Sequence, residues 1–375
     1  MPRTALTRHI AVIVLGVSTL VLAACGGAQA RKVKHLEKGQ AFLAAGNFEK
    51  ARVEFQNALQ IASADPEARF ENGVVDEKLG KARDAALFYQ GTIDISPDHV
   101  GARIGLARFY LFAGVSDKTL EVIKPALEKH PDNAELLTLR AAAHVQKKEL
   151  AEGQVDAERA VQLDPASENA VSALAGIYMS EKSPEKAQTL LEETIKKIPA
   201  SVSLRMALAQ VYAGENRVAD TERVLIEIVG LQPKVRENRI RLAQFYAHSK
   251  QDDAAERALR EGIKAIPQDR DLKLSLVDFL AAQRSPEVAE KELLADIAAQ
   301  PDDVELKFAL GKFYITNRKP ELAEKVYQGI IDSEKLNAAG ISARDRLAAL
   351  RAHRNDIKGT EELVGQVLGG MSRIC

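Results

Sequence analysis

The stretch PDHVGARIGLARFYLFAGVSDKTLEVIKPALEKH, residues 97–130, decides the fold, because its pattern returns along most of the chain. Pro97 is the first of seven prolines that are 34 residues apart, followed by Pro131, Pro165, Pro199, Pro233, Pro267 and Pro301. A small residue keeps the same step ten residues after this position: Gly39, Gly73, Ala107, Ala141, Ala175, Ala209, Ala243 and Gly311, with Val277 as the exception. A fixed period of this length is the signature of a repeat architecture.

Two further positions follow the same period. An aromatic residue comes three residues after the small one in Phe42, Tyr110, Tyr178, Tyr212, Tyr246 and Tyr314. A second small residue comes twelve after it in Ala51, Ala85, Ala187, Ala255, Ala289 and Ala323. The two small positions let a pair of antiparallel helices approach closely, and the aromatic ring fills the space beside them. Each proline ends a repeat because its ring cannot continue a helix.

These landmarks resemble the tetratricopeptide repeat, which implies an all-α, superhelical solenoid of antiparallel helix hairpins with about ten repeats. One family landmark is missing, the Trp four residues before the small position. Basic residues occupy that slot instead, which predicts a more basic face than the family usually has: Arg69, Arg103, Arg205, Arg239, Lys273 and Lys307.

The period also predicts the domain boundaries. Nine repeats in strict phase fill residues 32–334, and a tenth, displaced by three inserted residues, fills 335–368. We expect an irregular tail at 369–375, because the second helix of the tenth repeat is expected to stop at Gly369-Gly370. Solenoid ends normally need a polar cap, and none is visible for the last hairpin. The missing cap suggests a truncation of a longer array, which would make Cys375 incidental; the alternative is a thiol that pairs between molecules.

The N-terminus has the features of an export signal. Arg3 and Arg8 precede a short apolar run, which predicts a signal peptide over residues 1–24 rather than a part of the fold. The sequence Leu22-Ala23-Ala24-Cys25 resembles the lipobox of bacterial lipoproteins, which implies that Cys25 is acylated and followed by a short linker at 25–31. Gly26, by the same resemblance, favours the outer membrane, with the protein facing the periplasm. The alternative is an ordinary signal or an uncleaved anchor in which Cys25 has no role.

Composition and motifs argue against catalysis. Basic and acidic residues nearly balance, at 52 and 53, and no basic run marks a nucleic-acid site. No phosphate-binding loop, dinucleotide loop, nucleophile elbow or paired-His motif is present. We therefore expect no enzyme, no cofactor and no metal site.

The remaining candidate is a surface. In the tetratricopeptide family the first helix of each hairpin lines a concave groove, and its inward positions carry over by phase. In the second and third repeats the partner-groove residues are Phe70, Val74, Ile104, Arg108, Leu111 and Phe112. Later repeats offer a more polar wall, with Gln210, Gln244, His248, Asp278 and Lys312. The alternative for Phe70, Ile104 and Phe112 is packing between helices.

The resulting hypothesis is a protein-binding scaffold whose groove takes protein or peptide ligands. Long repeat lipoproteins of this kind resemble those found with exopolysaccharide export or surface-protein sorting in Gram-negative bacteria. Two alternatives stay open: an accessory to outer-membrane protein or pilus assembly, and an adaptor that regulates cell-wall hydrolases.

Overall fold

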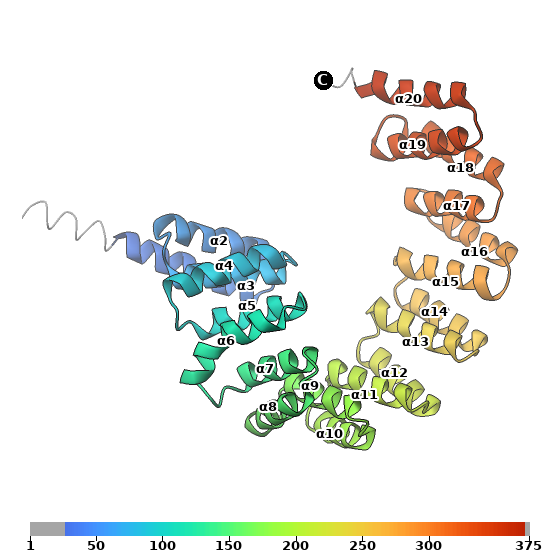
Figure 1. The fold of residues 1–375 in the computed structure, drawn as a ribbon. Helices are drawn as coiled ribbons and strands as arrows, with labels where there is room; N and C mark the ends of the chain where they lie inside the picture. Colours follow the sequence, from blue (N-terminus) through green and yellow to red (C-terminus); the bar gives the residue numbers. More distant parts are fainter. Residues whose placement is uncertain (1–26, 372–375) are drawn as a thin grey trace, which may run out of the picture. The chain divides into compact units, whose positions relative to one another are not determined.

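The computed structural model describes residues 27–371, and these residues form twenty helices and no strand. Consecutive helices pack as antiparallel hairpins (Figure 1), so the predicted all-α solenoid of hairpins is confirmed. The predicted signal peptide at 1–24, Cys25 and Cys375 lie outside the described residues.

The hairpins keep the period of the sequence. The first helix, residues 27–44, pairs with α2 (Phe48–Ile61). The next four hairpins are α3 (Pro66–Lys78) with α4 (Ala82–Ile95), α5 (Val100–Phe112) with α6 (Ser116–Lys129), α7 (Ala134–Gln146) with α8 (Leu150–Leu163), and α9 (Glu168–Ser180) with α10 (Pro184–Lys197). After α11 (Val202–Gly214) and α12 (Val218–Leu231) come α13 (Arg236–His248) with α14 (Asp252–Ala265), α15 (Arg270–Gln283) with α16 (Pro286–Ala299), α17 (Val304–Thr316) with α18 (Pro320–Glu334), and α19 (Ala338–His353) with α20 (Ile357–Met371).

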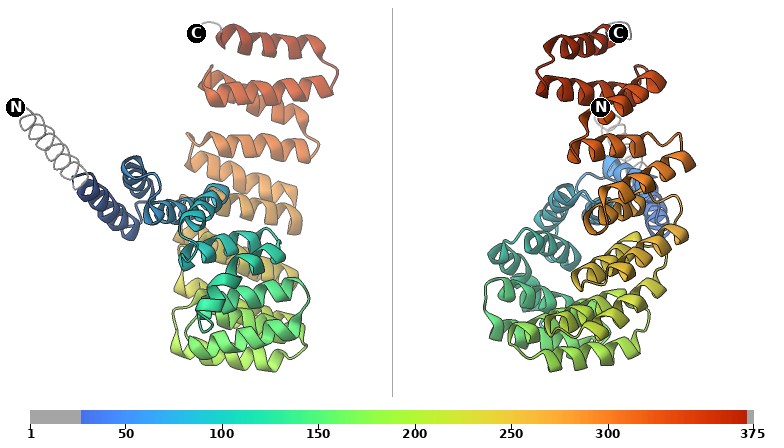
Figure 2. Two further views of the ribbon diagram at one scale, coloured as in Figure 1. Left: turned by 60° about the vertical axis from the view of Figure 1, so that its left-hand side comes forward. Right: turned by 90° about the vertical axis from the view of Figure 1, so that its right-hand side faces the viewer.

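The chain divides into two compact units, Met1–Val211 and Tyr212–Cys375, and the division falls within α11. In the first unit the leading helices of neighbouring hairpins touch, α3 with α5, α5 with α7, and α7 with α9. In the second unit α13 touches α15 in the same way, and the later hairpins stack in sequence (Figure 2).

Two predicted boundaries differ from the structure. The linker expected at 25–31 is helical from residue 27, and the irregular tail expected at 369–375 begins with helix, because α20 continues to Met371. Gly369 and Gly370 suggested a stop, but glycine costs a helix only about 1 kcal/mol and does not end one by itself. The inserted residues of the tenth repeat lengthen α19, which has 16 residues where α17 has 13.

Close packing inside each hairpin follows the predicted small positions. The second-helix alanines Ala51, Ala187, Ala255, Ala289 and Ala323 are completely buried. Where the first helix has glycine, the second helix has an aromatic ring against it. A Cβ on Gly73 would lie 2.6 Å from the Tyr89 ring, and a Cβ on Gly311 would lie 2.4 Å from the Tyr327 ring. Glycine in the first helix therefore leaves the space that the aromatic ring of the second helix fills.

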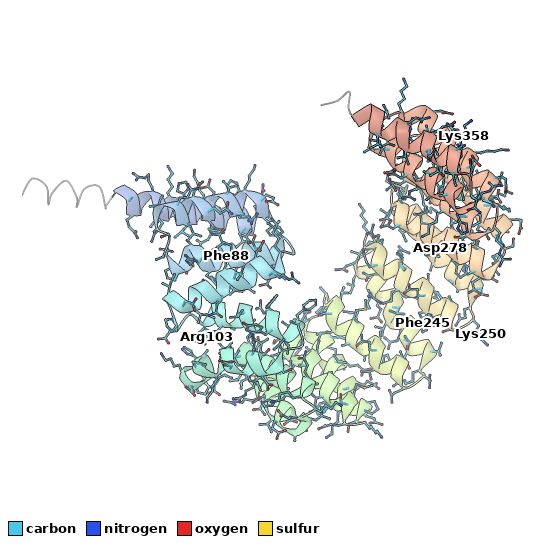
Figure 3. The ribbon with its side chains drawn as sticks, turned by 45° about the horizontal axis from the view of Figure 1, so that its top comes forward. Phe88, Arg103, Phe245, Lys250, Asp278 and Lys358 are labelled. Atoms are coloured by element: carbon cyan, nitrogen blue, oxygen red, sulfur yellow. The ribbon has the colours of Figure 1, made fainter. Side chains whose placement is uncertain are left out.

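Of the six cations in the slot of the missing Trp, two are buried and four are partly exposed. Arg103 (Figure 3) is buried, and its guanidinium donates to the carbonyls of Pro97, at 2.8 Å, and Val122, at 2.7 Å. Lys273 is also buried and donates to the Gln300 side chain. Arg344 takes the same slot in the displaced tenth repeat and donates to the Gly340 carbonyl at 3.1 Å. These three buried cations donate to carbonyl and amide oxygens at the repeat junctions instead of facing solvent.

The turn inside each hairpin has a residue with positive φ, except between α15 and α16, where Arg284 has a φ of −117°. In the first three hairpins it is glycine, at Gly46, Gly80 and Gly114. Later hairpins use residues with a side chain, Lys148, Lys182, Asn216, Lys250, Arg318 and Asn355. Glycine adopts this left-handed conformation without cost, whereas other residues are strained there by roughly 1–2 kcal/mol.

Candidate functional site

The six predicted groove residues separate into three groups. Phe112, the last residue of α5, is 91% exposed, and Arg108 one turn earlier is about half exposed. Ile104 is buried in the core with Ile123 and Leu136, so it belongs to the packing between helices. The other three are partly buried against core clusters: Phe70, Val74 and Leu111.

Phe70 lies between hairpins rather than in an open groove. Its ring centroid is 5.9 Å from that of Tyr89 and 4.6 Å from that of His99. A ring at Phe70 also approaches Gly101, whose Cβ would lie 2.9 Å from it. Phe70 therefore helps to join the second and third hairpins.

Arg108 and Phe112 meet at a pocket of about 290 Å³ in the first unit. Its walls come from α3, α4 and α5, and they are mostly apolar: Glu77, Ala82, Ala85, Ala86, Tyr89, Gly105, Arg108, Phe109 and Phe112. Tyr89 is buried, and Phe109 is half-buried. The space suits one large apolar side chain, with Phe112 standing free at its edge.

Charged groups form one rim of this pocket. The Tyr89 hydroxyl donates to Glu77 at 2.6 Å. Arg108 donates to Glu77 at 3.4 Å and also to Glu135 on α7, so it links three leading helices. Burial and the Glu77 hydrogen bond raise the pKa of Tyr89. Burial works against the charge of Arg108, but the hydrogen bond and charge of Glu135, together with Glu77, raise its pKa.

Phase alone did not identify Tyr89, the alanines of α4, or Glu135. The predicted inward positions lie on leading helices only, whereas one wall of the pocket comes from the second helix of a hairpin, α4. The sequence does contain one signal for Tyr89, namely the glycines that stand 16 residues before and 16 residues after it. Gly73 and Gly105 flank Tyr89, and a Cβ on Gly105 would lie 2.4 Å from its ring.

The second unit has a pocket at the same positions of the repeat. It has a volume of about 400 Å³ and lies between α15, α16 and α17. Its lining includes Leu274, Val277, Asp278, Ala281, Ala282, Leu293, Ala309, Lys312, Phe313, Thr316 and Asn317. Asp278 (Figure 3) and Lys312, two residues of the predicted polar wall, are both exposed here.

Two other kinds of site, a metal centre and a membrane span, concern residues 27–371. No group of three or more His, Cys, Asp or Glu side chains in this range could hold a metal ion. None of its helices combines the length and the apolar character that a membrane span requires. Cys25, the predicted acylation site, precedes this range.

Family comparisons match the N-terminal part of the array. One tetratricopeptide-repeat model matches residues 36–100, and a second matches residues 77–143. No curated protein matches the sequence significantly.

Solved structures resemble a larger part of the chain. A tetratricopeptide-repeat protein from Parabacteroides merdae shares 14% identity at a TM-score of 0.51, over 67% of this chain and 99% of that one. A thermophilic repeat protein from Thermus thermophilus shares 22% at 0.43, over 48% and 99%. The human IFIT1 dimer with PPP-AAAA shares 15% at 0.46, over 88% and 81%.

Close helix pairs, a strict period and open pockets define a helical-repeat protein. Residues 36–143 match tetratricopeptide repeats, and the remaining hairpins have the same helical-hairpin fold. Such repeats generally serve as non-catalytic scaffolds that bind proteins or peptides, and no enzyme family matches.

Proposed function

We propose that this protein is an interaction scaffold of the bacterial cell envelope, held by acyl chains on Cys25 and facing the periplasm from the outer membrane. Its task is to gather components of exopolysaccharide export or surface-protein sorting. The lipobox-like residues Leu22–Cys25 support the anchor. The resemblance to long repeat lipoproteins supports the pathway.

Phe112 is the observation that carries the binding role. A Phe side chain that is 91% exposed beside an apolar pocket leaves a large apolar area in water. Such patches with a polar rim mark interaction sites. A partner side chain that enters the pocket contacts Tyr89 and Phe109, and Phe112 then covers it from the side.

The charged rim adds direction to this contact. Arg108 is held between Glu77 and Glu135, so its guanidinium is fixed above the pocket before any partner arrives. Fixed groups lose less conformational freedom on binding than mobile ones do. The apolar pocket therefore supplies most of the affinity, and the rim selects the orientation of the partner.

Photocrosslinking in cells tests the groove. A photoreactive residue at position 112 of the full-length chain should capture specific proteins, whereas one at Leu87, which is 72% exposed on α4 outside the pocket, should not. Phe112→Ala should weaken binding of the captured partner about tenfold or more, with Leu87→Ala as the matched control. Equal capture from the two positions would remove the pocket as the binding site.

The anchor and the pathway have separate tests. Cys25→Ser should abolish incorporation of labelled palmitate and allow a high-salt wash to release the protein from the membrane fraction. Unchanged labelling would contradict the anchor. The identity of the captured proteins decides between export or sorting components, outer-membrane or pilus assembly factors, and cell-wall hydrolases.

A further inference from the structure

The helix of residues 27–44 has three exposed cations on one side. Arg31, Lys34 and Lys38 follow the i, i+3, i+7 spacing that places them on one helix face. We call these three residues the cationic end face. This helix lies at the edge of the first unit (Figure 2, left view, dark blue).

The repeat register shows that the two lysines occupy interface positions. Seven of the eight in-phase residues that correspond to Lys34 in later repeats are 0% exposed: Ala68, Ala102, Leu136, Ala170, Leu204, Leu272 and Leu306. The eighth, Asn238, is 5% exposed. The residues that correspond to Lys38 include Leu106, Leu174 and Leu276, which are also buried. Ala102 and Leu106, for example, pack against Ala85 and Tyr89 of the preceding hairpin. In the first hairpin this surface is cationic and exposed.

Nearby carboxylates are already engaged with other groups. Asp65 forms an ion pair with Lys32 at 2.5 Å, and Glu54 contacts His35 at 2.5 Å. Glu37 is the single acid of the helix, against four Lys and Arg residues. Within the described residues no carboxylate pairs with Arg31, Lys34 or Lys38, and Lys50 of α2 adds a further positive charge above the Phe42 ring. The end face therefore has an uncompensated positive charge.

We propose that the cationic end face binds the anionic headgroups of a phospholipid membrane. Basic residues next to an anionic surface gain about 1 kcal/mol each, and the attraction fades beyond about 10 Å at moderate salt. Arg31 follows Cys25 by six residues, which even fully extended reach only about 20 Å. For its orientation the inference rests on the proposed anchor at Cys25, which would hold the end face within range of the headgroups.

Binding in this way fixes the orientation of the first unit relative to the membrane. The first hairpin lies on the membrane, and α3 to α5, with the Phe112 pocket, follow it within the same unit. A lipid anchor alone permits free rotation, whereas a second, electrostatic contact restricts it. The partner bound at the pocket is then presented close to the membrane surface.

Vesicle sedimentation tests the proposal without any acyl chain. The probe is the chain expressed without residues 1–24 and with Cys25→Ser, which keeps the entire described fold. It should bind vesicles of phosphatidylcholine mixed with phosphatidylglycerol, release in high salt, and ignore vesicles of phosphatidylcholine alone. Joint Arg31→Gln, Lys34→Gln and Lys38→Gln should lower binding about a hundredfold, at one decade for every 1.4 kcal/mol.

A second triple variant controls for net charge. Lys124→Gln, Lys196→Gln and Lys197→Gln remove three exposed lysines from α6 and α10 of the same unit and should leave binding unchanged. Circular dichroism checks that both variants keep their helices. Equal loss in the two variants, or equal binding to both vesicle types, would overturn the proposal. Because the probe has no lipid, a failure of palmitate labelling at Cys25 in cells would remove the anchor and leave this result standing.

Discussion

The pocket of α3, α4 and α5 and the pocket of α15, α16 and α17 use the same positions of the repeat, six repeats apart. Phe112 corresponds to Thr316, Arg108 to Lys312, and Tyr89 to Leu293. The first pocket is smaller and aromatic, whereas the second has a more polar lining. The backbone period thus provides a hollow at equivalent places, and the side chains decide what each hollow can accept.

The aromatic wall of the first pocket depends on glycine. Gly105→Ala should lower the free energy of unfolding by about 1–3 kcal/mol, because the new Cβ would lie 2.4 Å from the Tyr89 ring. The second pocket has Ala309 beside Leu293 at these positions, so Tyr89→Leu should remove most of this cost in the double variant. Urea unfolding followed by circular dichroism measures both. Additive losses in the double variant would show that the two positions are independent.

The next largest difference in stability should come from the hairpin turns, because Gly114 in the first region corresponds to Arg318 in the second. Arg318 has a φ of 57°, so Arg318→Gly should raise stability by about 0.5–1 kcal/mol by relieving the left-handed strain. Gly114→Ala should lower it by a similar amount. Thermal unfolding of both variants is the measurement, and a loss of stability in Arg318→Gly would contradict the assignment of strain.

The charged rim should show a smaller difference. Arg108→Gln removes ion pairs to Glu77 and Glu135 and should cost about 0.5 kcal/mol in dilute buffer, since these groups are half exposed. Lys312 has no such pair within the described residues, so Lys312→Gln should have almost no effect. High salt should erase the cost of the first variant. A cost that persists in high salt would mean that Arg108 acts through packing.

The smallest effect should be a dependence on pH at Glu71, which corresponds to Ser275 in the second region. Burial raises the pKa of Glu71, although the Gln40 amide, at 3.3 Å, opposes the shift. The folded chain therefore takes up the proton first as pH falls, and the protonated form favours folding. Glu71→Gln should be more stable than the parent at neutral pH, and the two should converge below about pH 4. A difference that does not change with pH would contradict this assignment.

The hairpins follow from the sequence because steric rules at a few positions determine them. Glycine or alanine at the close contact, proline at the junction and a polar cap such as Asn133, which accepts from the Leu136 amide, are local requirements with a fixed spacing. The period therefore predicts the helices, their pairing and the displaced tenth repeat. The glycines near Met371 show where this fails, since weak helix formers can continue a helix that packs on its neighbour.

The site is harder to predict because exposure depends on neighbouring side chains. Ile104 and Phe112 lie in the same expected inward rows, but one is buried against Ile123 and the other is open. The sequence predicts a surface charge at Arg103. In the structure its guanidinium is buried and donates hydrogen bonds to the carbonyls of two segments. Helical phase gives a direction from the axis. It does not give the distance to the next hairpin.

The lysines of the cationic end face have a consequence for assembly. Solenoids can polymerise head to tail when the last hairpin of one molecule stacks on the first hairpin of another. At this end such a stack would enclose Lys34 and Lys38 at positions where later repeats mostly place alanine or leucine. Removing two unpaired ammonium groups from water costs several kcal/mol each, so we expect head-to-tail stacking at this end to be unfavourable. Substituting both residues by leucine should promote association between molecules through this end.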